Sequence, residues 1–155
     1  MKRRSFLKST LVASAAGVAV TSGLLSSSNV FAAAVMGADL AKAKSVDEIM
    51  TMLGATGAEE SDKIKIKAPE IAENGAVVPV GITSEIEGTT EIISLTAANP
   101  TPFAARYMMG EGAEAAVKSR FKMGKTTDVI AIVKAGDKFY TAKTNVKVTK
   151  GGCGG

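Results

Sequence analysis

Apolar and polar residues alternate with a period of two through most of the chain beyond residue 60. A period of two places every second side chain on the same face of an extended strand, so each such run predicts a half-buried β-strand. The positions that share a face in these runs are Ile64 and Ile66; Val78, Val80 and Ile82; Phe103, Ala105 and Tyr107; Val117, Ser119, Phe121 and Met123; and Val146 and Val148. Ile92-Ile93-Ser94-Leu95 forms a further strand in which apolar residues are adjacent.

Residues 129–133 are continuously apolar and rich in β-branched side chains, which predicts a central strand. Ala135-Gly136-Asp137 follows as a hairpin turn that leads into Phe139-Tyr140. Asn99-Pro100-Thr101-Pro102 predicts a rigid loop between the third and fourth strands. Seven or eight short strands separated by frequent turns predict an antiparallel β-sandwich over residues 35–150.

A helical period interrupts the pattern once, before the first strand. Val46, Ile49, Met50 and Leu53 lie on one face of a helix over about residues 45–53. Ser45 and Glu48 have the spacing of a capping box, and Gly54 follows where a C-terminal cap belongs. We interpret the methionines here as core residues and not as metal ligands.

Residues 1–34 have the pattern of an export signal. Lys2-Arg3-Arg4 precedes a charge-free, mildly apolar stretch that ends in small residues at Ala32-Ala33-Ala34, which fits a cleavage site better than a permanent membrane anchor. Arg3-Arg4 followed by Phe6-Leu7-Lys8 predicts a twin-arginine signal, although Lys2 replaces the usual Ser or Thr. Because this pathway exports folded proteins, we expect a periplasmic protein that is exported together with a partner.

Charge and composition exclude several classes of function. The formal charge of +4 comes from the leader: four of the 19 Lys and Arg residues lie there with none of the 15 Asp and Glu residues, so the remainder is neutral. We therefore expect no nucleic-acid binding. The chain has no His and one Cys, which excludes a His-based metal site, a Ser-His-Asp or Cys-His pair and an internal disulfide. We expect no catalytic residue, no metal and no cofactor.

A stripe of basic residues, Lys118, Arg120 and Lys122, alternates with the apolar residues of the fifth strand. We interpret it as a solvated sheet face and not as a specific anion site.

The chain ends in Lys150-Gly151-Gly152-Cys153-Gly154-Gly155. Glycine is costly to order, so Gly151, Gly152, Gly154 and Gly155 predict a flexible arm over residues 151–155. The preceding Val146-Lys147-Val148-Thr149 predicts a firm strand, so the arm would hold the Cys153 thiol on a short tether of at most about 17 Å. A free thiol of pKa about 8.5, with no base fixed beside it, is suited to accept and release sulfur by exchange more than to catalyse.

Other interpretations of Cys153 remain open at this point. The segment could be a passive tail. Cys153 could instead join a structural module to a partner by an intermolecular disulfide. A third hypothesis is a thiocarboxylate on Gly155, as in ubiquitin-like sulfur carriers, although the cytoplasmic enzymes that load those proteins would not easily meet an exported chain.

The Gly-Gly-Cys-Gly-Gly end after Val-Lys-Val-Thr-Lys, the twin-arginine leader, the helix followed by strands and the Asn-Pro-x-Pro loop at 99–102 together resemble the SoxY family. This family supplies the sulfur-carrying subunit of the bacterial thiosulfate-oxidising system. The resemblance covers essentially the whole chain.

The resemblance implies an immunoglobulin-like antiparallel β-sandwich with a short N-terminal helix and a flexible C-terminal arm. It implies that Cys153 is joined to thiosulfate by a haem-containing partner, after which other periplasmic enzymes release sulfate and oxidise the remaining persulfide sulfur. It also implies a heterodimer with SoxZ, a second small β-sandwich protein that has no signal of its own. The protein would thus be a carrier and not an enzyme.

Overall fold

The computed structural model describes residues 37–149. The predicted leader and the predicted arm, including Cys153, lie outside this range and stay predictions. None of the helices between residues 37 and 149 is long and apolar enough to cross a membrane.

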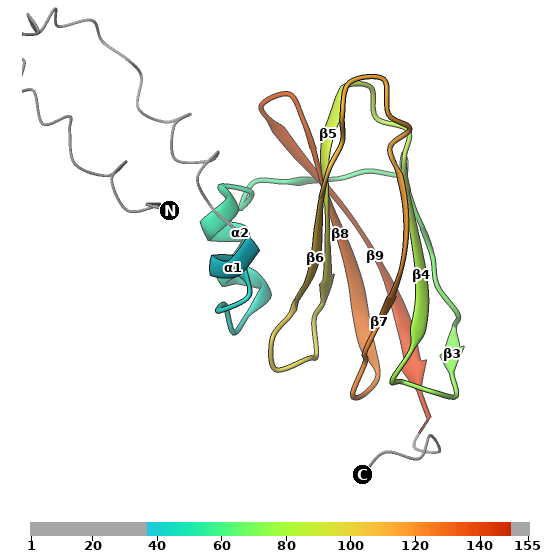
Figure 1. Cartoon of the computed structure of the whole chain (residues 1–155). Helices are drawn as coiled ribbons and strands as arrows, with labels where there is room; N and C mark the ends of the chain where they lie inside the picture. The colour runs from blue at the N-terminus through green and yellow to red at the C-terminus, as the bar shows by residue number, and fades with distance from the viewer. Residues whose placement is uncertain (1–36, 150–155) are drawn as a thin grey trace, which may run out of the picture.

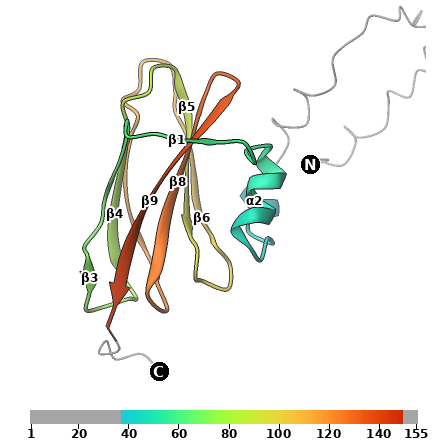
Figure 2. The ribbon, with the colours of Figure 1, turned by 180° about the vertical axis from the view of Figure 1, so that it is seen from behind.

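Two β-sheets pack face to face, with two short helices on the outer face of the larger sheet (Figures 1 and 2). The larger sheet has the order β1-β9-β8-β5-β6, with β3 also paired to β9, and the smaller sheet has the order β2-β4-β7. The strands are β1 (Glu59–Glu60), β2 (Ile64–Lys67), β3 (Ile71–Ala72), β4 (Val78–Ser84), β5 (Thr89–Thr96), β6 (Phe103–Met108), β7 (Ala116–Phe121), β8 (Thr127–Ala135) and β9 (Lys138–Val148). The predicted mainly β sandwich is confirmed.

The larger sheet is buried on both of its faces, which explains the continuous apolar run in β8. Val129, Ala131 and Val133 point into the layer between the two sheets, whereas Ile132 points toward the helices. Ile92 and Ile93 of β5 divide in the same way. Since β8 lies between β9 and β5, the predicted central strand is confirmed.

Helix α2 (Val46–Leu53) has the predicted boundaries, and α1 (Gly37–Leu40) precedes it. The Ser45 hydroxyl accepts a hydrogen bond from the Glu48 amide at 3.1 Å, and Gly54 ends the helix at φ 71°. The Glu48 carboxylate reaches the amide of Lys44, one residue before the cap, at 2.8 Å. The buried residues Ile49 and Leu53 pack the helix against the larger sheet.

The structure differs from the sequence pattern in β6. Phe103 and Tyr107 lie four residues apart in one period-two run, yet Phe103 packs with the helices and Tyr107 packs between the sheets. An irregularity in the pairing explains the difference, because Ser94 opposes Ala105 while Leu95 opposes Phe103. The additional residue in β6 turns the side chains that precede it to the other face.

The predicted segments around Phe139-Tyr140 and Val146-Val148 belong to one strand, β9, of 11 residues. The hairpin before it is confirmed, with Ala135 opposite Lys138 and Gly136 at φ 59°. Two short strands were not predicted: β1 and β3 pair in parallel with opposite ends of β9, so the otherwise antiparallel sandwich has two parallel contacts.

Candidate functional site

Cys153 and its four glycines lie outside the described residues, so the structure defines the point from which the predicted arm leaves. That point is the end of β9, which lies beside β3 at one end of the sandwich (Figure 1). The predicted firm strand before the arm is confirmed, since β9 extends to Val148.

Hydrogen bonds hold both sides of β9 up to its last residues. On one side, Lys147 donates to the Glu70 carbonyl at 2.9 Å and Thr149 donates to the Ala72 carbonyl at 3.1 Å. On the other side, the Val148 amide donates to the Thr126 hydroxyl at 3.1 Å. The described chain is therefore held by hydrogen bonds as far as Thr149.

The loop between β7 and β8 that carries Thr126 is itself held by the predicted rigid loop. The Asn99 side-chain amide donates to the Lys122 carbonyl at 2.7 Å and to the Thr96 hydroxyl at 2.9 Å. The Asn99 side-chain oxygen accepts from the Gly124 amide at 3.3 Å. One side chain thus connects the end of β5 to the loop that supports the end of β9.

Gly75 packs between the β7–β8 loop and the end of β9. Its carbonyl accepts a hydrogen bond from the Met123 amide at 2.7 Å. A Cβ atom at Gly75 would lie 2.3 Å from the Met123 carbonyl oxygen and 2.8 Å from a methyl group of Val148. Only glycine fits between the β7–β8 loop and the last strand.

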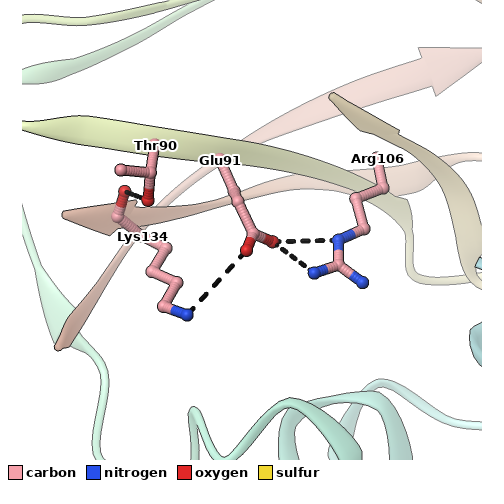
Figure 3. Close-up of polar contacts among 4 residues, drawn as sticks. All are labelled: Thr90, Glu91, Arg106 and Lys134. Atoms are coloured by element: carbon pink, nitrogen blue, oxygen red, sulfur yellow. Dashed lines mark hydrogen bonds and ion pairs between the residues drawn. The ribbon is translucent and has the colours of Figure 1, made fainter. Parts of the chain in front are cut away.

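Glu91, Arg106 and Lys134 form a buried charged cluster (Figure 3). It lies near the start of β9, because Lys134 is paired with Phe139. The Glu91 carboxylate lies 2.7 Å from Nη2 and 2.9 Å from Nε of Arg106. It also lies 3.9 Å from the Lys134 ammonium. The three residues come from the adjacent strands β5, β6 and β8. The cluster lies close to the β8–β9 turn and not to the end of β9, so we assign it to the stability of the sheet.

This cluster was missed in the sequence, because Glu91 merely precedes an apolar run there. Burial of its side chain to 7% exposure follows from the neighbouring strands and has no local signal. Within residues 37–149, no three potential metal-ligating side chains come together.

The fold and the chain end together define a class: a small two-sheet sandwich whose last strand is fixed to its end and continues into a segment with the chain's single cysteine. The family model "Sulfur oxidation protein SoxY" matches residues 49–153, a range that includes every strand and Cys153. The chain belongs to the SoxY family.

A solved structure agrees with this assignment. The chain is similar to the sulfur carrier protein SoxY from Chlorobium limicola f thiosulfatophilum, at 43% identity and a TM-score of 0.61 over 66% of this chain and 94% of that chain. It is similar in fold alone to the superoxide reductase (neelaredoxin) from Ignicoccus hospitalis, at 17% identity and a TM-score of 0.51 over 68% and 93% of the two chains. No curated protein matches the sequence.

Proposed function

We propose that this protein is a periplasmic sulfur carrier, which holds thiosulfate-derived sulfur covalently on Cys153 and presents it to partner enzymes. The family match that extends to Cys153 carries the proposal. The anchored end of β9 supports it, since a carrier needs a rigid body from which to offer its thiol.

Loading in this proposal is an oxidation. The Cys153 thiol loses a proton and forms a sulfur–sulfur bond with the outer sulfur of thiosulfate, and two electrons pass to a haem-containing partner. Water then attacks the terminal sulfonate sulfur, which releases sulfate and two protons and leaves a persulfide on Cys153. Further partners oxidise the persulfide sulfur. The chain supplies the attachment point, and the partners supply the catalysis.

The proposal includes export and a partner subunit. The Arg3-Arg4 leader directs the folded chain to the periplasm, and a SoxZ-like small β-sandwich subunit travels with it as a heterodimer. Gly151, Gly152, Gly154 and Gly155 form the flexible arm that lets Cys153 enter a narrow channel on each enzyme.

Mass spectrometry of protein isolated from cells that oxidise thiosulfate tests the attachment. We expect sulfur, sulfite or thiosulfate adducts on the peptide that contains Cys153. Adducts on the Gly155 carboxylate would instead identify a thiocarboxylate carrier. A peptide without any adduct, from actively oxidising cells, would overturn the proposal.

Cys153→Ser tests whether the thiol is needed. We expect this variant to lose thiosulfate-dependent activity of the reconstituted system and to keep the melting temperature of the parent protein. Non-reducing electrophoresis distinguishes the structural alternative. A permanent Cys153 disulfide to a partner, with full activity and no exchange, would show a structural joint and not a carrier.

A further inference from the structure

The outer face of the β2–β4–β7 sheet carries a basic groove that the sulfur chemistry does not use. The sheet lies on the side of the sandwich away from the helices, as both views show (Figures 1 and 2). The groove has a volume of about 870 Å³. Its floor lies along β4 at Pro79 and Gly81, and its lining continues along the β2–β3 connection to Pro69.

The strand register explains why this face is hollow. Gly81 on the central strand lies opposite Lys67 on β2 and opposite Lys118 on β7. Pro79 lies opposite Arg120. Because Gly81 has no side chain and Pro79 has a short ring, the long side chains of the outer strands stand above the central strand. The result is a trough whose walls are about 10 Å apart, twice the spacing of neighbouring strands.

The walls of the groove are basic throughout. Strands β2, β4 and β7 contain no acidic residue, and their charged residues are all Lys or Arg. Three of these exposed residues line the groove, namely Lys67, Lys118 and Arg120. The ion pairs found within residues 37–149 involve other side chains. The positive charges of the groove therefore have no carboxylate partner among the described residues.

We propose that this groove binds an extended, acidic segment of a protein partner. The apolar floor at Pro79 and Gly81 suits small apolar side chains, and the basic walls suit carboxylates on either side. The volume lies in the range of sites for ligands of peptide or drug size and far exceeds one small anion. A flat membrane surface would contact the protruding Lys and Arg side chains without filling the trough between them.

The groove lies toward the end of the sandwich at which β9 ends. Pro69 leads into β3, and Ala72 of β3 accepts the hydrogen bond from Thr149. A segment bound there would hold its protein close to the end of β9. A role of this partner in sulfur transfer rests on the proposed function. Binding of the segment in the groove does not depend on that function.

Nuclear magnetic resonance titration of the purified protein with a short synthetic peptide of alternating Glu and Val tests the proposal. We expect shifts of the Lys67, Gly81 and Lys118 amides with the acidic peptide and none with a peptide of alternating Lys and Val. Since screening weakens exposed charge pairs, the affinity should fall at about 0.5 M salt. The same titration on Cys153→Ser should be unchanged, which separates this test from the carrier hypothesis.

Two variants with different chemistry isolate the groove. Lys118→Glu combined with Arg120→Glu reverses one wall and should weaken peptide binding about tenfold or more. Gly81→Val fills the floor without changing charge, and the groove has room for its Cβ, which would lie 3.7 Å from the Lys67 Cβ. It should weaken binding similarly while the protein keeps its melting temperature.

The matched controls are Lys143→Glu, an exposed cation on β9, and Thr83→Val, which lies beyond the groove on β4. Both should bind the acidic peptide like the parent protein. The proposal is overturned if the acidic peptide does not bind, if all variants bind it equally, or if only vesicles of anionic phospholipid bind to this face.

Discussion

The side-chain amide of Asn99 donates a hydrogen bond to the backbone carbonyl of Lys122, 23 positions further along the chain, at 2.7 Å. This contact joins the loop after β5 to the loop before β8. The second loop carries Thr126, whose hydroxyl accepts from the amide of Val148 at the end of β9. The hydrogen bonds that hold the end of β9 thus extend back to the Asn-Pro-x-Pro loop.

Asn99→Ala should lower the free energy of unfolding by about 1–3 kcal/mol, because three hydrogen bonds are lost at a partly buried site. Denaturant unfolding measures this change. Hydrogen exchange at the Val148 amide should also accelerate more than exchange in the centre of β8. Asn145→Ala is the control, since it removes one exposed hydrogen bond to Asp128. Equal effects of the two changes would contradict the support described here.

Gly75→Ala should destabilise the protein by about 1–3 kcal/mol, because the new methyl group must displace a backbone carbonyl or the Val148 side chain. Thermal unfolding is the measurement. Gly57→Ala provides the matched control, since no atom lies within 4 Å of its added Cβ and its φ is not in the left-handed region. If both alanines were tolerated equally, the close approach of the two loops would be wrong.

Glu91→Gln should cost about 2–4 kcal/mol, because it leaves two cations beside a neutral amide in the sheet. We expect a smaller loss of stability than for a fully buried ion pair, because the Arg106 and Lys134 side chains are 14% and 22% exposed. Urea unfolding should show it. Asp39→Asn, which breaks the exposed pair with Lys42, should change stability by less than about 1 kcal/mol. A Glu91→Gln protein as stable as Asp39→Asn would argue against a stabilising cluster.

Ser45→Ala should reduce stability by about 1 kcal/mol, because the Glu48 amide loses its acceptor at the start of α2. Calorimetry of the variant beside Ser61→Ala, whose hydroxyl accepts from Lys63 at an exposed turn, gives the comparison. Only the first change should lower the melting temperature clearly.

The leader gives a cellular prediction. Replacement of Arg3 and Arg4 by Lys should abolish export if residues 1–34 are a twin-arginine signal, because that pathway requires the arginine pair. Cell fractionation with an antibody against the protein measures the periplasmic share. Replacement of Lys8 by Arg is the control and should leave export intact. Continued export without the arginine pair would point to a different route.

The local pattern of residues along the chain determined the helix boundaries and the burial of the strands. The Ser45–Glu48 cap and Gly54 mark the helix boundaries in the sequence because caps depend on neighbours along the chain. Alternation in β4 and the continuous apolar run in β8 reveal burial on one face and on two faces, since side chains of a strand point to opposite sides. The identification of Cys153 as the carrier thiol also comes from sequence alone, and it stays a prediction.

Contacts between segments that are distant in the sequence determined the features that the local pattern did not predict. The additional residue in β6, the burial of Glu91 and the hydrogen bonds of Asn99 depend on strands and loops that meet only in the folded chain. The basic stripe at Lys118 and Arg120 is visible in the sequence, but a groove exists only because Gly81 and Pro79 lie beside it in the sheet. The periodicity of apolar residues indicates which face of a helix or strand is buried. Which strands pair with each other depends on the free energy of the whole folded chain, to which segments distant in the sequence contribute.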